Sequence, residues 1–113
     1  MSKALKRKDF LELLSKSRSA KKRQILTDLA AKKDIEAVSE CAINLLKGNI
    51  LLSKTQYDKF YKCKDAIRTL ANRKNSLKSK KEVINQRGGF LNVLLPLALA
   101  AIIELIHKKK KKK

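Results

Sequence analysis

The chain has 113 residues, which suffice for one small domain with appendages but leave little room for an enclosed active site. Its 29 lysines and arginines outnumber its 10 acidic residues, and the resulting formal charge of +19 divides into +8 over 1–33, +6 over 34–89 and +5 over 90–113. This positive charge therefore belongs to the whole chain, and it attracts polyanions such as nucleic acid or anionic lipid.

The chemically reactive residues are few and do not form a catalytic pattern. Cys41 and Cys63 have no neighbouring histidine or second cysteine to complete a zinc site, so we expect two reduced, partly buried thiols. The single histidine, His107, adjoins the lysine run, and the three glycines form no phosphate-binding loop. No apolar run typical of a signal peptide opens the chain. We expect a protein without enzymatic activity, metal or cofactor, in a reducing compartment.

Apolar residues at helical spacing predict an all-α fold, with a small bundle of about four short helices and a separate hydrophobic C-terminal helix. The first helix falls within residues 1–16 and places Phe10, Leu13 and Leu14 on one face. Serines alternate with basic residues over 15–19, and we place a loop there because serine competes for backbone hydrogen bonds.

A second helix is predicted over 20–31, with Ile25, Leu26 and Leu29 directed inward. Three consecutive cations crowd its first turn, where the helix dipole disfavours positive charge. A bound phosphate would relieve this conflict, so the pattern indicates a polyanionic partner.

The third and fourth helices carry the clearest signals. Asp34 can cap the third helix, and Gly48 supplies the left-handed residue that ends it. Ser53 and Gln56 form a capping box for the fourth helix, which we predict to run unbroken to about Asn72. The predicted inward residues are Ile35, Val38, Ala42, Leu45 and Leu46 in the third helix and Tyr57, Phe60, Cys63, Ile67, Leu70 and Ala71 in the fourth.

A short helix over 76–86 is rich in lysine and poor in apolar residues, so we expect it to become ordered only against a partner. The chain thus divides into a basic helix and linker (1–19), a helical core (20–75), a basic helix ending in a Gly-Gly hinge (76–89) and a hydrophobic helix with a hexalysine tail (90–113). The basic residues that we expect to contact nucleic-acid phosphates are Lys21, Lys22, Arg23, Lys62, Lys64, Arg68, Arg73, Lys74, Lys78, Lys80 and Lys81.

The last segment is strongly apolar: from 90 to 107 only Asn92, Glu104 and His107 are polar. Eighteen helical residues span about 27 Å, slightly less than the ~30 Å hydrocarbon core of a bilayer. An obliquely inserted, membrane-perturbing helix fits this length better than a stable anchor. The expected membrane contacts are Phe90, Leu91, Val93, Leu94, Leu95, Leu97, Leu99, Ile102, Ile103, Leu105 and Ile106. Burial in the bundle's own core, self-association and docking in a partner's groove are the alternatives.

Two motifs, NQRGGFL at residues 85–91 and ECAINLLKGN at residues 40–49, resemble a known family. They are similar to the small basic, membrane-active minor virion proteins of adenovirus-like viruses and of Polinton/Maverick (adintovirus-type) elements. The resemblance implies that a viral cysteine protease cuts after Gly88-Gly89, before Phe90, and thereby releases the hydrophobic helix. The hexalysine end and Gln86 depart from the family's pattern.

The charge and the resemblance together predict a non-enzymatic minor virion or core protein that binds nucleic acid non-specifically and carries a releasable membrane-perturbing helix. They imply a location in the virion or in the host nucleus or cytoplasm, with membrane association through 90–107 during entry and possible self-association. Because most of the few aromatic residues are expected in the core, we expect binding to the double-stranded backbone rather than stacking on single strands. The alternative is a tail-anchored membrane protein or an interaction module without a nucleic-acid role.

Overall fold

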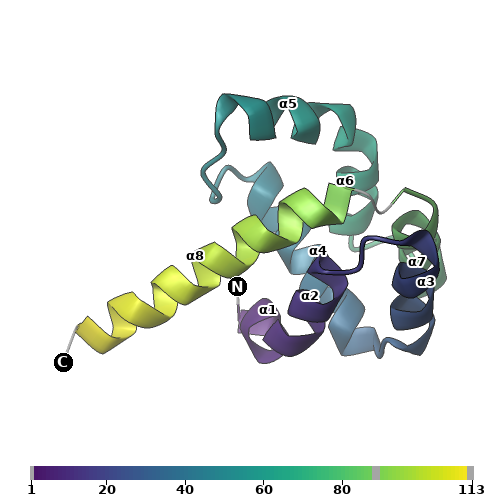
Figure 1. Cartoon of the computed structure of the whole chain (residues 1–113), viewed down its shortest axis with the longest axis horizontal. Helices are drawn as coiled ribbons and strands as arrows, with labels where there is room; N and C mark the ends of the chain where they lie inside the picture. Colours follow the sequence, from purple (N-terminus) through teal and green to yellow (C-terminus); the bar gives the residue numbers. More distant parts are fainter. Residues whose placement is uncertain (1, 88–89, 112–113) are drawn as a thin grey trace.

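The computed structural model describes the backbone of residues 2–87 and 90–111 and the side chains of residues 3–86, 90–101 and 104. Within these ranges the chain forms α-helices and no β-strand (Figure 1), so the predicted all-α class is confirmed. The helices are α1 (Ser2–Lys6), α2 (Lys8–Ser15), α3 (Ala20–Leu29), α4 (Lys32–Leu46), α5 (Lys54–Lys62), α6 (Lys64–Ala71), α7 (Leu77–Arg87) and α8 (Leu91–Lys111). The central helix is α4, which packs against α1, α2, α6, α7 and α8.

The N-terminal segment forms two short helices rather than one. Leu11 and Leu14 of α2 are fully buried, whereas Leu13 is 57% exposed. The predicted inward position of Leu13 is therefore wrong, because α2 packs on α8 and α4 through the side that carries Leu11 and Leu14. The predicted loop after α2 is confirmed, and Ser17 closes it by donating a hydrogen bond from its hydroxyl to the carbonyl oxygen of Leu13 at 2.9 Å.

Helix α3 turns Arg23 and Thr27 inward, and of its three apolar residues predicted to face the core only Leu26 packs partly against it. Its apolar residues Ile25 and Leu29 are 52% and 81% exposed, whereas Arg23 and Thr27 are buried. The reason is its neighbour: α3 packs mainly on α7, a helix with few apolar side chains of its own. A hydrogen bond from the guanidinium of Arg23 and the methyl-bearing side chain of Thr27 take the place of a leucine interface there.

The predictions for α4 are largely confirmed. Ile35, Val38, Ala42 and Leu45 are buried. The helix begins earlier than predicted, with Ala31 as its N-cap, and Asp34 lies in the first turn, where its carboxylate accepts a hydrogen bond from the backbone N–H of Ala31 at 3.0 Å. Beyond the helix, Gly48 has φ +77°, the left-handed conformation that a side chain would strain. Leu46, by contrast, is 37% exposed, so its predicted inward position is wrong.

The predicted fourth helix is broken into α5 and α6 at Cys63. Ser53 and Gln56 form the predicted capping box at the start of α5, with reciprocal hydrogen bonds of 2.8 and 3.2 Å. Helix α6 buries Ala66, Ile67 and Leu70 against the core, whereas α5 buries no residue. The break lets α5 leave the bundle, and Tyr57 is consequently 52% exposed rather than inward-facing.

Helix α7 forms within the chain itself by packing on α3 and α6. Ser76 caps it, since its hydroxyl oxygen accepts a hydrogen bond from the backbone N–H of Ser79 at 3.1 Å. Ile84 is its fully buried apolar residue. We expected this helix to become ordered only against a partner, and helices of the same chain provide that contact.

The separate C-terminal helix that we expected is not confirmed, because the first part of α8 lies in the core. Phe90, Leu91, Leu94, Leu95 and Leu99 are each at most 8% exposed. They pack with residues of α2 and α4, and the side-chain amide of Asn92 donates a hydrogen bond to the carbonyl oxygen of Ser15 at 2.8 Å. Toward its C-terminal end α8 extends beyond the other helices (Figure 1). The side chains of Ile102, Ile103, Leu105 and Ile106 lie outside the described residues.

An apolar groove of about 320 Å³ separates α5 from α8. Val93 and Leu97, two more of the expected membrane contacts, are half-buried and line it together with Phe60 and Cys63. Among the described residues, no helix combines the length and the hydropathy that crossing a membrane requires.

Candidate nucleic-acid interface

Acidic side chains are too few to neutralise the surface. Ion pairs form on α1, α2 and α4, where Lys3 lies 3.7 Å from Glu36 and Arg7 lies 3.7 Å from Asp34. Even if each of the 10 acidic residues neutralised one cation, the 29 basic residues would leave an excess of 19. The protein thus presents cations without acidic partners, and these are the groups that can replace the counterions of a polyanion.

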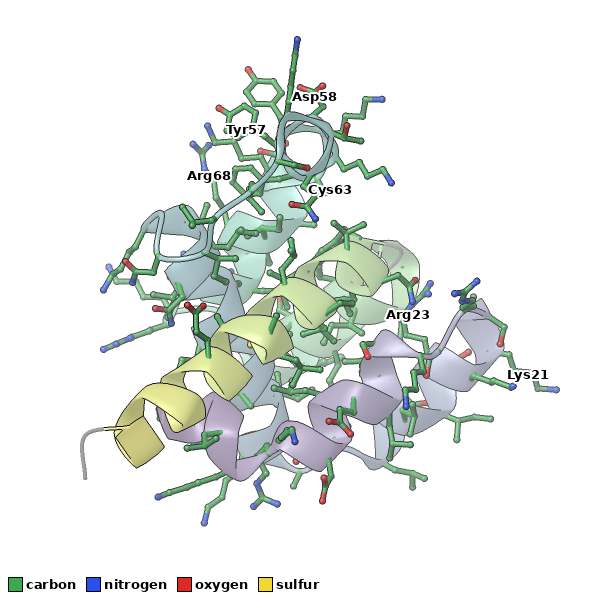
Figure 2. All side chains as sticks on the ribbon, turned by 60° about the vertical axis from the view of Figure 1, so that its left-hand side comes forward. Lys21, Arg23, Tyr57, Asp58, Cys63 and Arg68 are labelled. Atoms are coloured by element: carbon green, nitrogen blue, oxygen red, sulfur yellow. The ribbon has the colours of Figure 1, made fainter. Side chains whose placement is uncertain are left out.

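The pair of α3 and α7 carries exposed cations at both of its ends. The two helices run antiparallel, because Arg23 near the start of α3 bonds Ile84 near the end of α7. Lys21 and Lys22, at the start of α3, are exposed, and Lys21 projects outward (Figure 2). Lys78, at the start of α7, is also exposed and belongs to the opposite end of the pair. These predicted contact residues are therefore accessible but do not form one cluster.

Arg23 is not available to nucleic acid, which corrects the prediction for this residue. It is 8% exposed, and its Nε donates a hydrogen bond to the carbonyl oxygen of Ile84 at 3.0 Å. The guanidinium therefore joins α3 to α7. Sequence spacing grouped it with Lys21 and Lys22 because nothing in the local pattern distinguishes an exposed cation from one turned toward a neighbouring helix.

Replacing Arg23 by methionine is expected to lower the free energy of unfolding by about 1.5–3 kcal/mol, because a buried charge-assisted hydrogen bond is removed. The matched change Lys22→Met removes an exposed cation and should alter stability by less than about 0.5 kcal/mol. Urea denaturation followed by circular dichroism measures both. Equal stabilities for the two variants would contradict the structural role of Arg23.

Lys80 and Lys81 each donate a hydrogen bond to an oxygen atom of the protein itself. The ammonium of Lys81 donates a hydrogen bond to the carbonyl oxygen of Ala30, just after the end of α3, at 3.0 Å. That of Lys80 donates to the hydroxyl of Ser39 on α4 at 3.0 Å, and burial lowers the pKa of Lys80 below its usual value. Both are half-buried, so they offer less to a phosphate than the exposed lysines do.

The remaining predicted contacts come from α5, α6 and the loop that follows α6. Lys62, Arg68, Arg73 and Lys74 are exposed, and Lys64 is half-buried. This region therefore contributes most of the predicted cations that are accessible. Lys62 is exposed on α5, which buries no residue, whereas Arg68 is exposed on α6 and Arg73 and Lys74 in the loop after it.

A polar groove of about 550 Å³ beside α4 gathers cations that the sequence did not indicate. Lys3 of α1 and Lys32 and Lys47 from the two ends of α4 line it together with Arg73 and Lys80. The carboxylates of α4, Glu36 and Glu40, also border it, so its charge is mixed. Only the packing of α1 and the α6–α7 loop on α4 brings these residues together.

The proposed cleavage site is partly outside the described residues. Gly88 and Gly89 belong to the part of the chain that the structure leaves undescribed, whereas Phe90 is 8% exposed in the core. A protease that binds its substrate as an extended segment would have to draw Phe90 out of the core. Cleavage there stays a prediction.

The cysteines are free and differ in accessibility. Cys41 is fully buried in the core, and burial raises the pKa of its thiol to about 12, so it is protonated at neutral pH. Cys63 is half-buried at the apolar groove. Within the described part of the chain, His, Cys, Asp and Glu residues do not gather in threes as a metal site would require. Comparison with protein-family models, with curated proteins and with solved structures finds no match to this chain.

Proposed function

We propose that this protein is a non-enzymatic structural protein of the virion-core type that binds nucleic acid through its phosphate backbone without reading sequence. The observation that carries the proposal is the surplus of exposed cations over several faces of one small bundle. Lys21 and Lys22 on α3, Lys78 on α7 and Arg68 on α6 are exposed on different helices. A polyanion that wraps the bundle could contact all of them, whereas a small anionic substrate could contact only one group.

The distribution of the cations supports backbone binding rather than sequence reading. Recognition of base edges in duplex DNA requires an element that enters a groove with several polar side chains on one face. Here the basic residues surround the bundle, and the inward positions of α3 are occupied by Arg23 and Thr27. Scattered cations favour contacts that are numerous, individually weak and independent of sequence.

Affinity for a duplex oligonucleotide is expected to fall about 10³-fold or more between 50 and 200 mM salt, as for proteins that neutralise at least six phosphates. Fluorescence anisotropy with duplexes of two unrelated sequences measures both this slope and any sequence preference. Substituting Lys21, Lys22 and Lys78 with methionine should lower the slope by about one unit for each phosphate that the variant no longer neutralises. A salt-independent complex, or a strong preference for one sequence, would overturn the proposal.

A second function, perturbation of membranes by α8, is favoured by one specific observation. The segment that buries Leu94 and Leu95 in the core continues as a helix beyond the bundle toward the lysine tail. The docked helix keeps Leu94 and Leu95 from lipid, and it would present them once it is drawn out. We propose that membrane contact through α8 is latent in the intact chain and depends on release from α2 and α4.

A further inference from the structure

Two tyrosines lie on the outer face of α5, in the region with the most accessible cations. Tyr57 and Tyr61 are 52% and 62% exposed, and their ring centroids are 6.5 Å apart with an interplanar angle of 32°. Residues four apart share a helix face, so both rings are presented to the same side. The sequence pattern places Tyr57 in the core, and the break at Cys63 exposes it.

The ring of Tyr57 also contacts a third aromatic residue of the same helix. Phe60 is half-buried at the apolar groove, and its centroid lies 5.9 Å from that of Tyr57 at a tilt of 57°. Phe60 therefore connects the ring of Tyr57 to the apolar groove. Both tyrosines therefore keep more than half of their surface accessible to a ligand, and the ammonium of Lys64 lies over one face of the Tyr61 ring.

One cation lies over the Tyr61 ring, and others are close to the tyrosines along the chain. The ammonium of Lys64 lies 5.5 Å from the centre of the Tyr61 ring. Arg68, one turn further along α6, is exposed, and Figure 2 shows Tyr57 and Arg68 at the same end of the molecule. Over residues 53–75 there are seven basic side chains against two acidic ones, Asp58 and Asp65. Paired aromatic faces within an excess of positive charge match a ligand that has both flat rings and phosphates.

We propose that Tyr57 and Tyr61 form a stacking platform for unpaired bases, and that single-stranded nucleic acid is bound there with its phosphates near Lys64 and Arg68. Bases of a duplex are already stacked on one another, so they cannot use the tyrosine rings, whereas unpaired bases can. This inference rests on the proposed binding of nucleic acid and adds a preference for unpaired strands. It reverses the expectation that binding to the double-stranded backbone is favoured over stacking on single strands.

The test uses the full chain, a fluorescein-labelled oligothymidine and a duplex of equal length. Changing both tyrosines to leucine is expected to weaken binding of the single strand at least about tenfold, since stacking contributes about 1–3 kcal/mol per base. Duplex affinity should change less than about twofold, and the salt slope should stay unchanged because no ionic contact is removed. Changing both tyrosines to phenylalanine should retain the affinity, because the stacking faces remain. The circular dichroism spectrum of each variant checks that α5 is folded.

A second readout is direct, because the chain has two tyrosines and no tryptophan. Tyrosine fluorescence of the unmodified protein therefore reports only on this platform, and it should be quenched by oligothymidine and not by the duplex. If both nucleic acids bind and neither quenches the tyrosines, the platform is overturned while backbone binding stands. If neither nucleic acid binds, the platform and the proposed function both fail.

Discussion

Replacing Leu95 by alanine is expected to lower the free energy of unfolding by about 2–5 kcal/mol, the range for deleting a buried leucine side chain. Leu95 is fully buried, and it lies on the part of α8 that packs against α2 and α4. A chain of this size has a stability of about 5–15 kcal/mol, so this single change would remove a large fraction of it. The thermal midpoint should fall by at least about 10 °C. Urea and thermal denaturation followed by circular dichroism measure the two quantities.

The matched control is Leu51→Ala, the same chemical change at a side chain that is 92% exposed. Its effect should be below about 0.5 kcal/mol, because the Leu51 side chain packs against little of the protein. The difference between the variants isolates the contribution of packing by α8. If Leu95→Ala lowered the free energy of unfolding as little as Leu51→Ala, α8 would not be part of the core. The expectation of a separate C-terminal helix would then hold.

Producing residues 1–89 as a fragment without residues 90–113 is expected to leave that fragment unfolded. The buried residues Phe90, Leu91, Leu94, Leu95 and Leu99 would be removed together. Burial of each such side chain contributes about 1.5–3 kcal/mol, and the sum is comparable with the whole stability of a small domain. The fragment 1–89 should therefore lose its cooperative thermal transition, whereas the full chain keeps one. A fragment that melts as sharply as the full chain would show that α8 does not stabilise the body.

The other part of the chain tests the membrane proposal. A peptide of residues 90–113 should release vesicle contents at a concentration at least about tenfold lower than the intact chain, since even ~1.4 kcal/mol of docking energy gives this factor. A control peptide with Leu94 and Leu95 changed to glutamine keeps the charge and should be inactive. Equal leakage by the peptide and the intact chain would contradict the proposal that docking of α8 in the core suppresses its contact with membranes. An inactive peptide would remove the membrane function and favour a purely structural role for α8.

The proposed membrane contact and the stability of the bundle depend on the same residues. Leu91, Leu94, Leu95 and Leu99, which the membrane proposal places in lipid, pack with residues of α2 and α4, so release of α8 and loss of the bundle are coupled. Phe90, which follows the proposed cleavage site, is itself a core residue. Any cleavage there would be controlled by local opening of the bundle, and destabilising variants such as Leu95→Ala should be cut faster.

The sequence alone determined the features that depend on local chemistry. The helical class follows from apolar spacing without alternation, and the capping groups of Asp34, Ser53 and Ser76 mark helix starts through short-range hydrogen bonds. Gly48 ends α4 because only glycine adopts φ +77° without strain. The charge of +19 is a property of composition that folding does not change, so attraction to polyanions follows from the residue types themselves.

Only the tertiary structure decided which faces are covered, because burial depends on neighbours that are distant in sequence. The sequence of the segment after Phe90 predicts membrane contact, whereas Leu91, Leu94, Leu95 and Leu99 lie in the core, packed with residues of α2 and α4. Arg23 is turned inward by an acceptor 61 residues away, and Tyr57 is turned outward by the break at Cys63. A periodic pattern predicts that a helix has an apolar side, but it does not predict which part of the protein that side will contact.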